Sequence, residues 1–202
     1  MTNPKKSLEL PKLGETTRKK SFNSINEKLI CHPEALPAFT AWNAIKKHTL
    51  KQSDIPEPIK ELHLRAARKI AIITEDAPTQ SDKKTRKTVY FLNSFATVQR
   101  AMQLEIKQLP VDSVSNIDPA GICQHAWFEV ANLMFEPLDH RYGWVSYRDI
   151  INQSMPRDLI RQFFGQDQIS VEMLLKWSGM DMRAYERMRA AYRKDNPQTK
   201  KS

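Results

Sequence analysis

The clearest β-strand pattern in this 202-residue chain covers Thr88 to Leu92, and it follows a dense cluster of cations. Four of the five residues from Lys83 to Lys87 are Lys or Arg. A single strand leaves its backbone N–H and C=O groups without partners, and even an isolated two-stranded hairpin is only marginally stable in water. The strand therefore needs a partner, and one candidate is the same strand in a second copy of the chain.

The rest of the sequence favours helices joined by stiff connections, because it contains 12 prolines and only 5 glycines. Apolar periodicity and helix-end signals predict helices over 37–48, 59–73, 94–108 and 119–135, then shorter helices over 146–152, 156–164, 171–178 and 182–194. Residues 1–24 are polar and lysine-rich, so we expect them to lack fixed structure. We therefore expect a mainly α fold with one short strand and with a loop over 110–117.

Composition and charge divide the chain into five segments. We expect a basic disordered tail over 1–30, N-terminal helices and a connector over 31–80, a core over 81–136, a C-terminal helical region over 137–195 and a tail over 196–202. The net charge of +9 lies in the two ends, since residues 1–30 carry +4, residues 182–202 carry +5 and the remainder is neutral. Basic ends are typical of proteins that bind a polyanion, although they also serve solubility.

The strand and the two helices behind it resemble the ribbon-helix-helix regulators, the superfamily that contains the Arc, CopG and MetJ repressors. The resemblance rests on the stretch from Arg86 to Leu92 and on residues 93–108 and 118–135. In that family two strands pair as an antiparallel ribbon in the DNA major groove, and the helices form the core of a dimer. The resemblance implies a ribbon-helix-helix-like core with additional N- and C-terminal helices, whose strand pairs across a homodimer.

The same resemblance implies a set of DNA-binding residues. They comprise the cations before the strand, the outward strand residues and the start of the second helix: Lys83, Lys84, Arg86, Lys87, Thr88, Tyr90, Ser115 and Asn116. We assign Val89 and Phe91 to the inward face together with Lys87. Two alternatives remain open: the strand pairs inside a single chain, or the helix that follows it simply starts early.

A second candidate DNA contact lies near the C-terminus. Residues 171–178, a turn at Gly179 and residues 182–194 have the layout of a helix-turn-helix, in which Ser170 and Asp181 are the expected N-caps. The apolar positions of such a pair are filled by Leu174, Met180, Tyr185 and Met188. Four arginines would project from its second helix toward phosphates or guanines: Arg183, Arg187, Arg189 and Arg193. The alternative is an ordinary helical hairpin with a solvated basic face.

The sequence carries no recognisable catalytic motif. Its five histidines share no metal-ligand spacing, and it has no phosphate-binding glycine loop, GxSxG or HExxH. Cys31 and Cys123 form no CxxC, which fits a reducing compartment. No apolar run approaches the ~20 residues that a membrane-spanning helix needs. We therefore expect no enzymatic activity, no cofactor, no metal and no membrane association.

Together these patterns predict a cytoplasmic, homodimeric, sequence-specific DNA-binding transcription regulator. The resemblance further implies a regulator of a plasmid or another mobile element. The expected partners are double-stranded DNA and a second copy of the chain, and the additional helices could contact RNA polymerase. The rival hypothesis is a helical adaptor whose basic tails bind an acidic protein or RNA.

Overall fold

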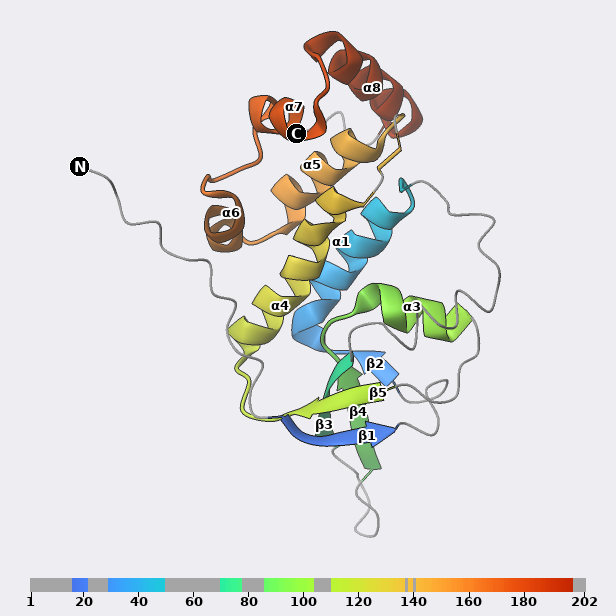
Figure 1. Ribbon diagram of the computed structural model, residues 1–202, viewed down its shortest axis with the longest axis vertical. Helices are drawn as coiled ribbons and strands as arrows, with labels where there is room; N and C mark the ends of the chain where they lie inside the picture. Colours follow the sequence, from blue (N-terminus) through green and yellow to red (C-terminus); the bar gives the residue numbers. More distant parts are fainter. Residues whose placement is uncertain are drawn as a thin grey trace, which may run out of the picture. The chain divides into compact units, whose positions relative to one another are not determined.

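The computed structural model describes residues 16–21, 29–49, 70–77, 86–103, 110–136, 138–139 and 141–197. They belong to two compact units that alternate along the chain (Figure 1). One unit takes in the described residues from 40 to 49 and from 130 to 197, and the other takes in those from 16 to 39 and from 70 to 129. We call them the helical unit and the sheet unit. Residues 59–69, which belong to a predicted helix, lie outside the described ranges.

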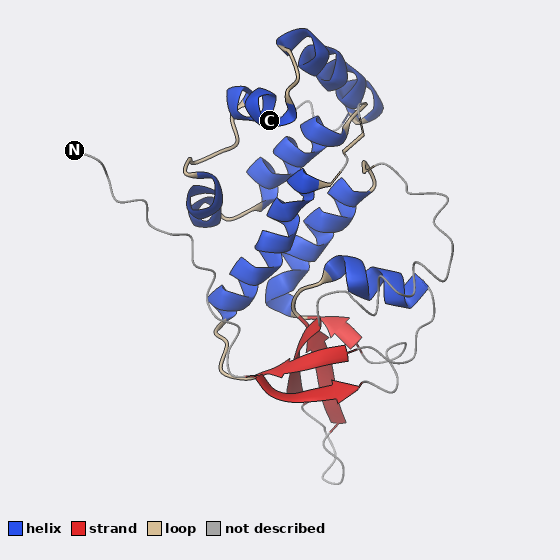
Figure 2. Cartoon of the chain, in the orientation of Figure 1, coloured by secondary structure: helices blue, strands red, loops and turns tan. Residues whose placement is uncertain are grey.

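The sheet unit contains a five-stranded mixed sheet (Figure 2). Its strands are β1 (Thr16–Ser21), β2 (Leu29–Cys31), β3 (Ile70–Ala77), β4 (Arg86–Phe91) and β5 (Pro110–Val114). Their order across the sheet is β1-β5-β3-β4-β2, so β4 has a neighbour on each side. Tyr90 of β4 lies opposite Ile73 of the antiparallel β3 and opposite Ile30 of the parallel β2.

The expected ribbon-helix-helix core, with a strand paired across a homodimer, is therefore wrong. The predicted strand exists, as β4, but β3 and β2 of the same chain complete its hydrogen-bonded ladder on both edges. The strand did need a partner, and the alternative of pairing inside one chain is confirmed. Because β4 is paired on both edges within one chain, its hydrogen bonding gives no reason to expect a second copy of the chain.

Three other segments differ from their sequence-based predictions. Residues 70–73, assigned to the end of a helix, begin β3, because a short run of β-branched and apolar residues fits a buried strand as well as a helical stripe. The expected loop over 110–117 contains β5, which buries Val111 and Val114. Residues 16–21, assigned to a disordered tail, form β1 and pair antiparallel with β5.

Three helices that begin in the described part of the sheet unit start close to their predicted positions, and two of them continue into the helical unit. A 3-10 turn, η1 (Pro33–Ala35), leads into α1 (Leu36–Lys46), and α3 (Phe95–Gln103) buries Phe95, Val98 and Ala101. The helix α4 (Pro119–Ala131) starts where Asp118 Oδ1 accepts a hydrogen bond from the Gly121 N–H at 2.6 Å. Asp118 is thus the N-cap and is followed by proline in the first helical position, and a 3-10 turn, η2 (Asn132–Phe135), continues the chain.

The helical unit contains α5 (Gly143–Ser154), α6 (Arg157–Phe164), α7 (Val171–Ser178) and α8 (Met182–Asp195). The start of α5 differs from the prediction, because Asp139 Oδ1 accepts from the N–H groups of Arg141, Tyr142 and Gly143. Ser146 is consequently buried inside the helix and does not cap it. None of the helices within the described ranges has the length and apolar character needed to cross a membrane.

Candidate nucleic-acid interface

The α7–α8 pair has the predicted helix-turn-helix layout, and local chemistry fixes both of its helix starts. Ser170 Oγ accepts from the Met173 N–H at 3.1 Å, and Asp181 Oδ1 accepts from the Ala184 N–H at 2.7 Å. Between the helices, Gly179 adopts a left-handed conformation with φ of 69° and donates its N–H to the Leu175 carbonyl at 2.9 Å. These are the N-caps and the glycine stop expected from sequence, so the predicted boundaries are confirmed.

One face of α8 is packed into the helical unit. Tyr185, Met188 and Tyr192 are buried on it, at the helical spacing of three and four residues, and α5 packs against both α7 and α8. On α7, Leu174 is completely buried. Leu174, Tyr185 and Met188 were predicted as the apolar positions of the pair, so this packing is confirmed. The buried face determines which side of α8 remains available to a partner.

The opposite face of α8 is cationic, and we call it the outward face. It consists of positions 183, 187, 190 and 194, which lie on one side of a helix with 3.6 residues per turn. Arg183, Arg187 and Lys194 are exposed, and Ala190 between them is also exposed. None of these three cations forms an ion pair with another residue in the described part of the chain. The outward face spans about 16 Å along the helix axis, at 1.5 Å per residue.

The two other predicted arginines lie on a different side of α8. Arg189 is only 38% exposed and its Nη1 lies 3.5 Å from Glu186 Oε1. Both Arg189 and Arg193 are close enough to Asp149 of α5 to favour its carboxylate. Arg189 and Arg193 are therefore turned toward α5, whereas Arg183 and Arg187 point away from it. Sequence reasoning placed all four arginines together, and the structure separates them into two pairs.

The charges at the N-terminal end of the outward face destabilise α8, whereas Lys194 in its last turn is favourably placed. Arg183 lies in the first turn of α8, where the helix dipole disfavours a cation, and Arg183 and Arg187 are like charges four residues apart. Arg183 and Arg187 are therefore placed as expected for cations that bind an anionic partner. Lys194 completes the outward face and was not among the predicted site residues, although its spacing of seven from Arg187 was a usable signal.

The pKa of Asp149, a carboxylate of α5 near Arg193, is shifted by its surroundings. Burial raises the pKa of Asp149 above its ordinary value, and the neighbouring Arg148 guanidinium opposes that shift through a 2.9 Å ion pair. Arg189 and Arg193 oppose it further from α8. Asp149 therefore lies on α5 near the side of α8 that carries Arg189 and Arg193.

The structure describes only part of the predicted ribbon site. Lys83 and Lys84 lie outside the described residues, as do the side chains of Arg86 and Lys87, whose backbone belongs to β4. Thr88 and Tyr90 are half-buried on one face of the sheet, while Val89 and Phe91 are buried on the other, so the predicted alternation is confirmed. The Tyr90 ring packs edge-on against His32 at 5.4 Å between ring centroids.

The two residues expected at a phosphate before the second helix belong to the sheet unit. Ser115 and Asn116 connect β5 to α4 in the sheet unit, and Asn116 adopts a left-handed backbone with φ of 58°. Asparagine is among the residues that tolerate this conformation, which gives Asn116 a backbone role in the turn.

Neither metal-binding groups among the described residues nor similarity to known proteins identifies a site. Within the described ranges, no three side chains of His, Cys, Asp or Glu gather so that they could hold a metal ion. The exposed cations of α8 are thus the most distinct chemical feature of the helical unit. No protein-family model, curated protein or solved structure matches this chain.

Proposed function

We propose that this protein binds double-stranded DNA and that α8 enters the major groove. The observation that carries the proposal is the placement of Arg183, Arg187 and Lys194 on the outward face, opposite the buried Tyr185 and Met188. In a helix-turn-helix the second helix lies in the major groove, and its N-terminal residues contact base edges. Arg183 and Arg187 occupy the N-terminal half of α8, where such contacts are made.

The geometry favours B-form DNA over duplex RNA. The major groove of B-DNA is about 12 Å wide and admits a helix, whereas the A-form groove of RNA is too deep and narrow for side chains to read. Arginine can bind guanine O6 and N7 with two hydrogen bonds, and lysine neutralises a phosphate. In this proposal Arg183 and Arg187 are the groove residues, while Lys194 near the helix end meets the backbone.

The test compares matched charge removals on the full chain. Fluorescence anisotropy on a labelled duplex at about 0.1 M salt should show that Arg183→Gln/Arg187→Gln weakens binding by about tenfold or more, since two contacts with DNA are lost. The matched control is Lys47→Gln/Arg157→Gln, which removes the same charge from exposed positions outside α8. The duplex affinity of the control should stay within about twofold of that of the unaltered protein. Its two lost charges do not contact DNA, so their removal weakens only the long-range attraction.

Three outcomes would contradict the proposal. The control could weaken binding as much as the α8 variant does, in which case net charge and not α8 governs binding. The α8 variant could bind the duplex as well as the unaltered protein does. An RNA duplex of the same sequence could bind more tightly than DNA, which would exclude a major-groove helix.

A further inference from the structure

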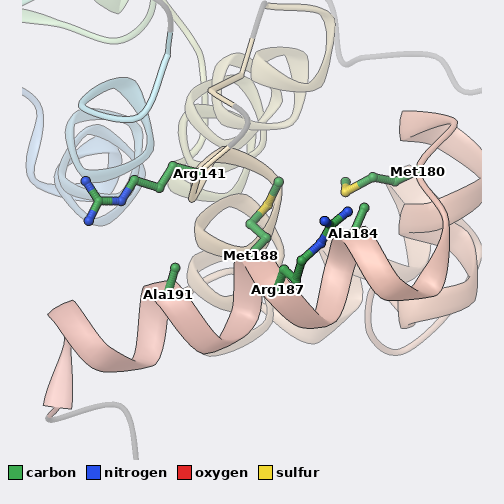
Figure 3. A pocket seen from close by; sticks show the side chains of 6 residues that line it. All are labelled: Arg141, Met180, Ala184, Arg187, Met188 and Ala191. Carbon is green, nitrogen blue, oxygen red and sulfur yellow. The ribbon is translucent and has the colours of Figure 1, made fainter.

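An open pocket of about 520 Å³ lies along one flank of α8, beside the outward face. Six residues line it: Arg141, Met180, Ala184, Arg187, Met188 and Ala191. Figure 3 shows Ala184, Met188 and Ala191 along the same side of the helix, with Met180 near its N-terminal end and Arg141 near its C-terminal end. We call this surface the α8 groove.

The floor of the α8 groove is apolar and built from adaptable or small side chains. Ala184 and Ala191 are seven residues apart, about 10 Å along α8, and their small side chains are partly exposed on the same side of the helix, with Arg187 and Met188 between them. Met180 and Met188 lie beside them, and methionine adjusts its shape to different apolar partners. Such a floor suits an apolar side chain and offers little to a phosphate.

Two guanidinium groups supply positive charge at the edges of the groove. Arg187 is exposed and forms no ion pair within the described ranges. Arg141 lies over the Tyr142 ring at 4.7 Å and donates from Nη2 to Asp195 Oδ2 at 3.1 Å. The Tyr142 hydroxyl also hydrogen-bonds to Asp195. A guanidinium carries five N–H donors, so Asp195 holds Arg141 in place and leaves donors for a further carboxylate.

We propose that the α8 groove binds an acidic segment of another protein. An apolar side chain of that segment enters between Ala184 and Ala191, and flanking carboxylates meet Arg141 and Arg187. The charge complementarity follows from the two arginines, and the open, elongated shape fits a peptide better than an enclosed small molecule. This inference goes beyond the DNA proposal and shares Arg187 with it, so duplex DNA and the acidic segment compete for that side chain. Arg141 lines the groove but is not part of the outward face, so Arg141→Gln separates the two proposals.

The test uses a labelled synthetic peptide of about 12 residues in which glutamates surround two leucines spaced four apart. Binding to the full chain is followed by fluorescence anisotropy, and circular dichroism confirms that each variant is folded. Arg141→Gln should weaken binding at least fivefold, and Ala184→Gln, which fills the groove without reducing helix propensity much, should weaken it at least tenfold. Arg157→Gln on α6 is the matched control and should change the affinity less than twofold.

Peptide variants show which chemistry the groove recognises. Changing the glutamates to glutamine and, separately, the leucines to serine should each abolish measurable binding. Equal binding of the glutamine peptide, or unchanged affinity of Ala184→Gln, would overturn the proposal. It would also be overturned if decanoate displaced the peptide at equal concentration, since the groove would then be a small-molecule site, or if the peptide failed to bind the folded protein at millimolar concentration.

Discussion

Replacing Gly179 with alanine tests whether backbone conformation alone shapes the turn between α7 and α8. Gly179 has φ of 69°, and a Cβ built on it meets no atom within 4 Å. The cost of alanine is therefore the left-handed strain of about 1–2 kcal/mol. The smaller entropy of the unfolded alanine chain offsets about 0.4–1 kcal/mol of it. We expect Gly179→Ala to lower the free energy of unfolding by about 1 kcal/mol.

Gly165 provides a matched control at the end of α6. It also has a left-handed backbone, with φ of 74°, and open space around the position of a Cβ. Gly165→Ala should therefore lose about the same stability, whereas Gly179→Asn should lose less, because asparagine tolerates this conformation.

Urea denaturation measures these losses, and Trp177, whose ring lies 5.6 Å from Phe164, is a local fluorescence reporter. A loss above about 3 kcal/mol in Gly179→Ala would refute the reasoning, because backbone strain does not reach that size. An equal loss for asparagine and alanine would refute it as well. We also expect Gly179→Ala to weaken duplex binding, since the strained turn sets the direction of α8, while Gly165→Ala leaves duplex affinity unchanged.

Three further predictions concern buried groups. Tyr147→Phe should lower the free energy of unfolding in urea by about 0.5–1.5 kcal/mol, because the buried hydroxyl donates to the Ala131 carbonyl at 2.8 Å and phenylalanine removes that hydrogen bond; a neutral variant would contradict this. Burial raises the pKa of Cys31 to about 12, so its alkylation by iodoacetamide, followed by mass spectrometry, should keep accelerating from pH 7 to 9. A rate that levels off below pH 9 would exclude this shift. Burial, and secondly the Glu34 carboxylate, raise the pKa of Cys123, so Glu34→Gln should speed its alkylation at pH 8, and a slower reaction would contradict that assignment.

The helix ends of the helical unit could be predicted because their signals are local. Ser170, Gly179 and Asp181 each form a hydrogen bond with a residue three or four positions away. Both partners of each bond can therefore be recognised in a short stretch of sequence. Asp139 shows the limit of this approach. It lies four residues before Gly143 and caps the turn there through three N–H groups, whereas Ser146, the predicted first residue of this helix, is buried inside it.

The sheet could not be predicted, because strand pairing joins residues that are far apart in sequence. β4 reads as a strand by itself, but nothing near it indicates that residues 29–31 and 70–77 are its partners. The candidate interface likewise has one part that the sequence predicts and one part that depends on tertiary packing. The spacing of Arg183, Arg187 and Lys194 is visible in the sequence, while the turning of Arg189 and Arg193 toward Asp149 depends on how α5 packs.

The salt dependence of duplex binding is the most direct test of α8 as the DNA-binding helix. Each phosphate that a cation neutralises contributes about 0.9 to the slope of log affinity against log salt. If Lys194 meets a phosphate as proposed, the α8 variant Lys194→Gln should reduce the slope by about 0.9, and the Lys47→Gln/Arg157→Gln control should keep the slope of the unaltered protein. An unchanged slope in the α8 variant, or an equal reduction in the control, would contradict the account.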